Sequence, residues 1–184
     1  MVAVKAYVAP RITSSWRGDV PTALTESFDR LFRAEYGRVT PIAFRILQDQ
    51  AEAEDVAQEV FLSYHRRYPA DAPYAAAWLY SAAAHTALNT LRGRRRRLQR
   101  EIAEARLRHA DGPDPVKVVE ERERNHAVRA ALARLPRRSA AILALRYSGL
   151  SYGEVASAMG VGINQIGNLL RRAEAAFRKE VPQP

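Results

Sequence analysis

The sequence contains no cysteine, which excludes disulfide bonds and thiolate metal ligands. This absence is typical of a protein in a reducing compartment, and we expect a cytoplasmic location. No apolar run approaches the roughly 20 residues that a membrane-spanning helix requires, and the hydrophobic stretch near the N-terminus is too short for a secretory signal. We therefore expect no membrane insertion.

Motifs for catalysis are also missing. The four histidines show no metal-ligand spacing, there is no glycine-rich phosphate loop, and no paired acid and base stands out from the other charged residues. We predict that the protein is not an enzyme and that it has no catalytic residue, cofactor or metal site.

Lysine is scarce, with three residues, so the net charge of +9 comes almost entirely from arginine. The charge is +5 over residues 93–110 and +6 over 125–184, but −2 over 26–92. Arginine is well suited to phosphate and base contacts. The sequence thus predicts a polyanionic partner that binds local basic surfaces.

Proline and glycine divide the chain. Residues 1–24 have no sustained periodicity and are predicted to be an irregular extension, while HADGPDPV at 109–116 is typical of a linker. We predict an all-α fold with two small helical domains, at residues 25–98 and 125–184, joined by a linker over 99–124.

Three helices are expected in the first domain. Apolar residues recur at helical spacing from Ser27 to Leu47, with Pro41 as a kink or restart. A second helix follows over residues 53–68, with either Phe61 or Leu62 facing inward, and an alanine-rich third helix is predicted over 75–91.

Two charged clusters in this domain each allow two interpretations. An acidic cluster near the start of the second helix either compensates the helix dipole or forms a docking surface for a basic protein. The four consecutive arginines 94–97 are either a solvated helix end or a phosphate contact. The acidic cluster consists of Asp49, Glu52, Glu54, Asp55 and Glu59.

The second domain ends in a predicted helix-turn-helix. Ser151 and Glu154 have the spacing of a capping box, Gly160 suits the turn, and the second helix begins near Ile163. Before it, Ser139 is expected to cap another helix. The alternative is an ordinary helix pair with a solvated polar face. Side chains expected to face outward and contact DNA are Gln165, Asn168, Arg171 and Arg172.

With these segments in place, the chain resembles the extracytoplasmic-function (ECF) class of bacterial sigma factors. The resemblance runs from Phe28 to Lys179 and includes AEDVAQEVFLSYHRRY, AAWLYSAAAHTALNTLRGRRRR and LPRRSAAILALRYSGLSYGEVASAMGV. It implies that the second helix docks on core RNA polymerase, which favours the docking interpretation of the acidic cluster. The implied docking residues are Asp55, Val56, Gln58, Glu59 and Phe61.

The same resemblance implies that the third helix melts and reads the minus-ten element. Ala82, Ala84, His85 and Asn89 depart from the usual residues of the family there. The expected DNA-binding side chains are Trp78, Tyr80, His85, Asn89, Arg92, Arg94, Arg95, Arg96 and Arg97.

The helix-turn-helix is similar to the family's minus-thirty-five domain, but its second helix departs from the family pattern. Gly167 costs a helix about 1 kcal/mol relative to alanine. Either it permits close backbone approach to DNA, or promoter contact is weaker here and depends more on the polymerase.

The resulting hypothesis is a transcription initiation factor whose partners are core RNA polymerase and promoter DNA, with an anti-sigma protein as a further candidate. The rival is a stand-alone helix-turn-helix regulator, which would bind a specific duplex without polymerase.

Overall fold

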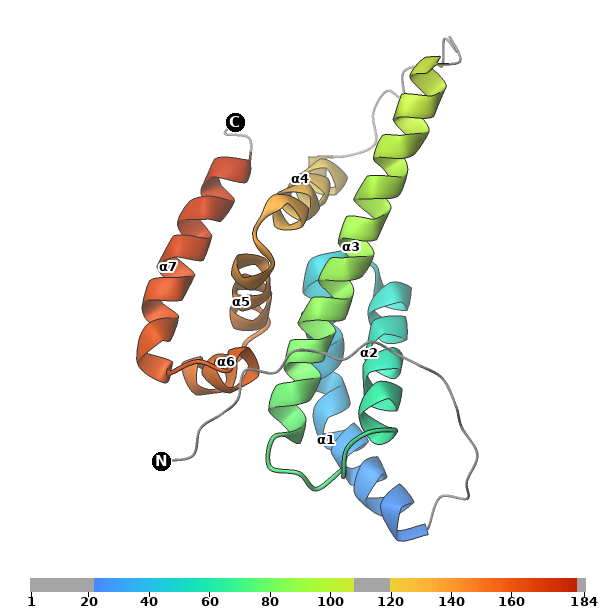
Figure 1. Cartoon of the computed structure of the whole chain (residues 1–184), viewed down its shortest axis with the longest axis vertical. Helices are drawn as coiled ribbons and strands as arrows, with labels where there is room; N and C mark the ends of the chain where they lie inside the picture. The colour runs from blue at the N-terminus through green and yellow to red at the C-terminus, as the bar shows by residue number, and fades with distance from the viewer. Residues whose placement is uncertain (1–21, 108–119, 182–184) are drawn as a thin grey trace.

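A computed structural model describes residues 22–107 and 120–181, and every regular element in these two ranges is an α-helix (Figure 1). Most of the expected extension and the segment 109–116 lie outside the described residues. No helix within the described ranges is long and apolar enough to cross a membrane. The helices are α1 (Thr22–Leu47), α2 (Gln50–His65), α3 (Ala75–Leu107), α4 (Glu120–Arg134), α5 (Arg137–Tyr147), α6 (Tyr152–Met159) and α7 (Ile163–Glu180).

The N-terminal half is a three-helix bundle in which α1, α2 and α3 pack against one another. Their inward positions carry large apolar side chains, and each such burial contributes roughly 1.5–3 kcal/mol. Of the two inward candidates in α2, Phe61 is buried whereas Leu62 is half exposed. The core residues of this bundle include Val39, Ile42, Ile46, Val56, Val60, Phe61, Leu79, Leu88 and Leu91.

Helix α1 runs through Pro41 without a restart. A proline inside a helix removes one hydrogen bond and costs about 3 kcal/mol. Here Pro41 is exposed, while Ile42 and Ala43 beside it are completely buried. Tertiary packing of the inward face therefore keeps both segments in one helix.

Helix α3 is longer than predicted, since it continues past Leu91 to Leu107. It includes all four consecutive arginines and the first part of the expected linker. Successive residues point about 100° apart on a helix, so the arginines are spread around it. Glu101 and Glu104 follow Arg97 and Arg100 at four-residue spacing, which is favourable for opposite charges.

The C-terminal half contains α4 to α7, with α6 and α7 forming the predicted helix-turn-helix. The capping box is confirmed: the Ser151 hydroxyl accepts from the Glu154 N–H, and the Glu154 carboxylate accepts from the Ser151 N–H. Gly160 ends α6 with φ of 62°. The expectation that Ser139 caps α5 was wrong. The helix begins at Arg137, two residues before Ser139, and its N-cap residue Pro136 makes no side-chain hydrogen bond.

The two halves pack against each other. Helix α3 contacts α1 and α2 and also α4, α5 and α6, and the buried residues of both halves form one hydrophobic cluster (Figure 1). Ala83, Ala84 and Ala87 of α3 are completely buried. Their short side chains allow neighbouring helices to approach α3 closely.

Replacement of Gly160 by alanine should lower the free energy of unfolding by about 1–2 kcal/mol, because an L-residue is strained in the left-handed conformation that this turn requires. Gly37 lies inside α1, and an added Cβ would meet nothing within 4 Å. The matched variant Gly37→Ala should therefore raise stability by about 0.5–1 kcal/mol. Urea unfolding measures both changes, and effects of the same sign would contradict the assignment of the turn.

Candidate functional site

One exposed stripe of α2 carries part of the predicted polymerase-docking set. Asp55, Gln58 and Glu59 are exposed, whereas Val56 and Phe61 are buried. Leu62, which the sequence left undecided, is 50% exposed and extends the same stripe. Positions 55, 58, 59 and 62 follow helical spacing, so this face offers two carboxylates, an amide and one apolar side chain.

The rest of the acidic cluster acts within the chain. Asp49 caps α2 by accepting a hydrogen bond from the Glu52 N–H at 3.0 Å, and Glu52 forms an ion pair with Arg94 of α3. The stabilising interpretation therefore holds for these two residues, whereas docking stays a prediction for the outward-facing carboxylates. Asp49 and Glu52 stabilise the helix start and its packing, while Asp55 and Glu59 face outward.

Two aromatic residues of the predicted minus-ten set lie inside the bundle. Tyr80 is 2% exposed, and its hydroxyl donates to the Glu35 carboxylate at 2.5 Å. Burial, followed by this hydrogen bond, raises the pKa of Tyr80 well above its usual value. The Trp78 ring is half-buried and packs against Tyr64 and Tyr68, with ring centroids 5.3 and 5.4 Å apart. The Tyr80 ring is therefore not accessible to a base in this arrangement, whereas the Trp78 ring remains partly exposed.

The remaining members of that set have different surroundings. His85 and Asn89 are exposed on α3, and so are Arg96 and Arg97 at its basic end. Loss of hydration, and then the positive charges of Arg137 and Arg92, lower the pKa of His85. This shift favours the neutral ring, in which one nitrogen donates and the other accepts.

Arg92 is occupied by the C-terminal half. Its guanidinium donates to the carbonyl oxygens of Ala133 and Leu135, at 3.3 and 2.7 Å. These carbonyls lie at the C-terminal end of α4, where backbone oxygens have no partner inside the helix. Arg92 therefore links α3 to α4.

Helix α7 presents a polar outer face as predicted. Gln165, Asn168, Arg171 and Arg172 are all exposed, while Ile166, Leu170 and Ala173 are buried against the neighbouring helices. The sequence interpretation missed two further exposed residues, Ile163 and Asn164, in the first turn of α7. Because the N-terminal residues of a recognition helix contact base edges, their position at the start of the predicted reading helix could have identified them.

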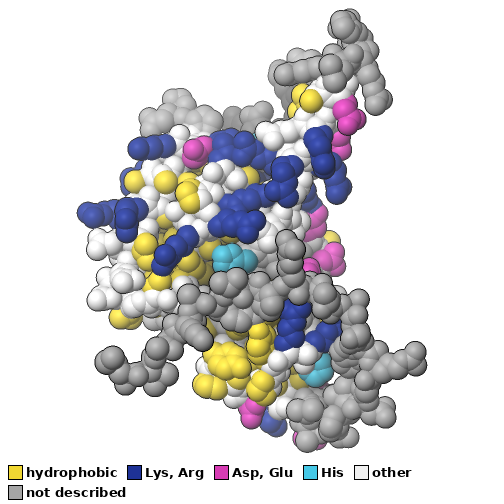
Figure 2. Space-filling view, viewed as in Figure 1, with side chains coloured by type: hydrophobic (Ala, Val, Ile, Leu, Met, Phe, Trp, Pro, Cys, Tyr) yellow, Lys and Arg dark blue, Asp and Glu magenta, His cyan; other side chains and the backbone are white. Residues whose placement is uncertain are grey.

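Figure 2 shows how the charges are distributed on one face of the molecule. Lysine and arginine side chains gather over α3 and the helices of the C-terminal half, with few carboxylates between them. Positive charge from two separate parts of the sequence thus shares one face.

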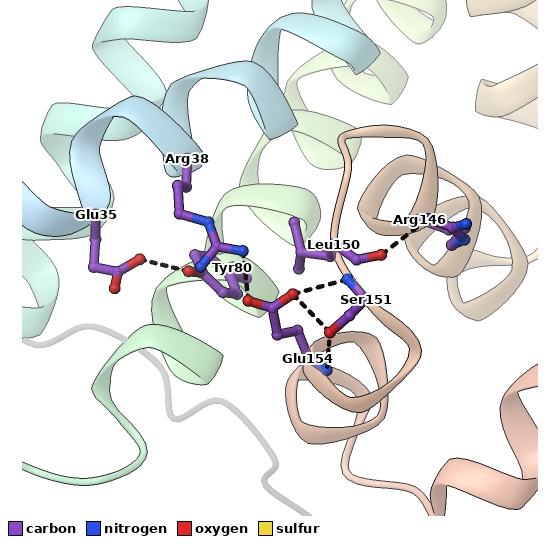
Figure 3. A network of polar contacts seen from close by, with 7 residues as sticks. All are labelled: Glu35, Arg38, Tyr80, Arg146, Leu150, Ser151 and Glu154. Atoms are coloured by element: carbon purple, nitrogen blue, oxygen red, sulfur yellow. Dashed lines mark hydrogen bonds and ion pairs between the residues drawn. The ribbon is translucent and has the colours of Figure 1, made fainter.

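A second polar link between the halves centres on Arg38 of α1 (Figure 3). Its guanidinium donates to the Glu154 carboxylate of α6 at 2.5 Å and lies over the Tyr80 ring, 5.1 Å from the centroid. The Ser151 N–H, the Arg38 guanidinium and the Ser151 hydroxyl together lower the pKa of Glu154 from 4.5 to about 2. The capping box of α6 is therefore joined to α1 and, through Tyr80, to α3.

An open pocket of about 250 Å³ lies where α2 ends. Tyr68, one of its lining residues, also contacts the Tyr74 and Trp78 rings, at centroid distances of 6.1 and 5.4 Å. The pocket thus combines aromatic and cationic side chains. It is lined by His65, Arg66, Arg67, Tyr68, Pro69 and Ala70.

Comparisons with known proteins identify two family regions in the chain. The family Sigma-70 region 2 matches residues 31–97, and Sigma-70, region 4 matches residues 125–177. The ECF RNA polymerase sigma factor SigE of Mycolicibacterium smegmatis is 28% identical over 159 residues, which are 85% of this chain and 62% of that protein. RNA polymerase sigma-H factor of Pseudomonas aeruginosa is 28% identical over 165 residues, 83% of this chain and 85% of that protein.

The chain spans 62% and 41% of the length of two of the relatives that it matches. Among solved structures, CnrH in complex with the cytosolic domain of CnrY has a TM-score of 0.50 and 17% identity, over 84% of this chain and 87% of that one. This likeness is one of fold.

Glu154→Gln should reduce the dependence of stability on pH. A carboxylate whose pKa is lowered in the folded state stabilises the fold fully above its ordinary pKa and loses that contribution as the pH falls through the folded value. For Glu154 this window runs from 4.5 down to about 2. Denaturant unfolding across the window should show a smaller loss of stability in the variant than in the parent, and an equal loss would contradict the assignment.

Proposed function

Because this chain belongs to the ECF class of the sigma-70 family, we propose that it binds core RNA polymerase and directs promoter-specific transcription initiation. It acts by binding, without catalysis of its own, in the cytoplasm where polymerase and promoters are found. The observation that carries the proposal is that two outward surfaces, the α2 stripe and the outer face of α7, occur in the two matched regions.

The α2 stripe is the polymerase-docking surface in this proposal. Asp55 and Glu59 supply charges for a basic partner, Gln58 supplies hydrogen bonds, and Leu62 supplies an apolar anchor. Exposed charges chiefly steer association, whereas a buried apolar anchor contributes more to affinity. Val56 and Phe61, which the resemblance included, support the stripe from the core.

The minus-ten element is read by α3 and the loop before it. Asn89 and His85 face bases, while Arg95, Arg96 and Arg97 contact phosphates. Trp78 and Tyr80 position this surface from within the bundle, because both are packed among other side chains. The aromatic and cationic pocket at the end of α2 has the chemistry to hold a base extruded from the duplex.

The minus-thirty-five element is read by the outer face of α7. Gln165 and Asn168 can donate to and accept from base edges, and Arg171 and Arg172 reach phosphates or guanine. An added Cβ at Gly167 would meet nothing within 4 Å, so packing inside the chain does not require glycine there. This supports close backbone approach to DNA as the reason for Gly167.

Attachment to polymerase strengthens both DNA contacts. Once one of the two promoter elements is bound, the other element is held close to its reading helix, which raises its effective concentration. An anti-sigma protein remains a candidate third partner. In support, the solved structure of similar fold holds CnrH in complex with the cytosolic domain of CnrY.

The purified chain added to core polymerase should produce transcripts from genomic fragments that core alone does not transcribe. Sequencing of the RNA 5′ ends should reveal a shared pair of upstream elements. Transcripts identical to those of core alone would overturn the proposal. Binding of the chain to a two-fold symmetric duplex without polymerase would favour the stand-alone regulator.

Glu59→Arg and Leu62→Ser should each weaken binding to core polymerase, because one reverses a steering charge and the other removes the apolar anchor. We expect roughly tenfold or greater losses in affinity, measured by fluorescence anisotropy of the labelled chain. Asp71→Arg is the matched control for charge reversal, since Asp71 is exposed in the loop after α2. Equal affinities for the parent, Glu59→Arg and Asp71→Arg would exclude the stripe as the docking surface.

A further inference from the structure

A polar stripe along α3 faces the point where α4 ends and α5 begins. His85, Asn89, Arg92 and Arg96 recur every three or four residues, the spacing that places side chains on one side of a helix. Arg92 shows what this side faces, because its guanidinium donates to the Leu135 carbonyl at 2.7 Å. The stripe therefore lies against the start of α5.

The start of α5 adds positive charge at the same place. Arg137 and Arg138 are its first two residues, and both are exposed. The first turn contains no acidic residue, and the N-cap residue Pro136 makes no side-chain hydrogen bond. A helix N-terminus itself carries partial positive charge, so these arginines are in an unfavourable position unless an anion lies beside them.

Three of these guanidinium groups, Arg92 and Arg96 of α3 and Arg137 of α5, form what we call the arginine cluster. Loss of hydration, and then the positive charges of Arg137 and Arg96, lower the pKa of Arg92. The three groups are thus close enough to repel one another. Within residues 22–107 and 120–181, no carboxylate forms an ion pair with any of them. Figure 2 likewise shows few acidic side chains among the basic ones on this face.

Phosphate is the anion that suits such a cluster. A guanidinium binds a phosphate group through two parallel N–H···O hydrogen bonds, and backbone N–H groups at a helix start can donate to the same oxygens. Arg92 already uses Nε and Nη2 for the carbonyls of Ala133 and Leu135. Arg96 and Arg137 therefore supply the direct contacts, and Arg92 contributes mainly its charge.

We propose that the arginine cluster binds a small anion with a diphosphate or longer polyphosphate group, at the junction of α3 and α5. Two linked phosphates offer acceptor oxygens to arginines on two helices at once. Further along the stripe, His85 and Asn89 are exposed and can donate to and accept from a base or a ribose. A nucleotide and inorganic pyrophosphate are thus the two sources of this chemistry.

The site goes beyond the proposed function, because it takes a small ligand and needs neither polymerase nor promoter DNA. Its arginines come from both halves of the chain, so a bound anion stabilises the folded arrangement in which α3 and α5 are adjacent. Measurements on the chain alone therefore test the site, and their failure would leave the initiation role intact.

Isothermal titration calorimetry of the full chain with inorganic pyrophosphate should show saturable one-to-one binding. Arg96→Gln and Arg137→Gln should each weaken binding about tenfold or more, because each removes a charged donor. Arg30→Gln is the matched control, since Arg30 is exposed on α1, and it should leave the affinity unchanged. Titrations with ADP and GDP identify the source: tighter binding than pyrophosphate indicates a nucleotide, and equal binding indicates the phosphate groups alone.

Urea unfolding gives a second measurement. Without pyrophosphate, Arg137→Gln should unfold at a higher urea concentration than the parent, because it removes repulsion from Arg92 and from the helix N-terminus. Saturating pyrophosphate should raise the midpoint of the parent much more than that of the variant. Sodium chloride at the same ionic strength should have a smaller effect on the parent, since it acts only by screening.

Three results would each overturn the site. The first is no saturable binding of pyrophosphate, ADP or GDP. The second is equal weakening of binding by Arg30→Gln and Arg137→Gln, which would indicate a general effect of net charge. The third is an equal rise of the parent's unfolding midpoint in sodium chloride and in pyrophosphate.

Discussion

The packing of α3 between the two halves is the constraint on which the rest of the structure depends. One side of the helix completes the bundle with α1 and α2, and another receives α5 and α6. Completely buried alanines make this possible, because longer side chains would hold the neighbouring helices away. The same helix is the predicted reader of the minus-ten element, so packing decides which of its predicted DNA-binding residues are exposed.

Arginine side chains have two kinds of surroundings in this protein: some bind other parts of the chain, and others are exposed. Arg38, Arg92 and Arg129 meet a carboxylate or the carbonyls at a helix end, where they join segments distant in the sequence. Arg96 and Arg97 lie on the exposed end of α3. A guanidinium can donate to several acceptors at once, which suits contacts within the chain as well as the proposed contacts with DNA phosphates.

Much of the local structure was predictable because it depends on short-range spacing. Ser151 and Glu154 form their capping box within one turn of helix, and Gly160 ends that helix through its own backbone freedom. The inward stripe of α7 follows from helical periodicity alone. The end of α3 was not predictable in this way, since the arginine run indicated a helix end, whereas spreading around the helix axis lets all four arginines remain helical.

The sequence by itself determined an all-α fold, a capped helix-turn-helix and an outward polar face on α7, because periodicity and capping act over a few residues. Only the tertiary structure decided which predicted DNA-binding residues are accessible. Tyr80 and Arg92 have the residue types of such a site, but one is buried beside Glu35 and the other is bound to α4. Those partners lie more than 40 residues away in the chain, so only the packing of the helices brings them together.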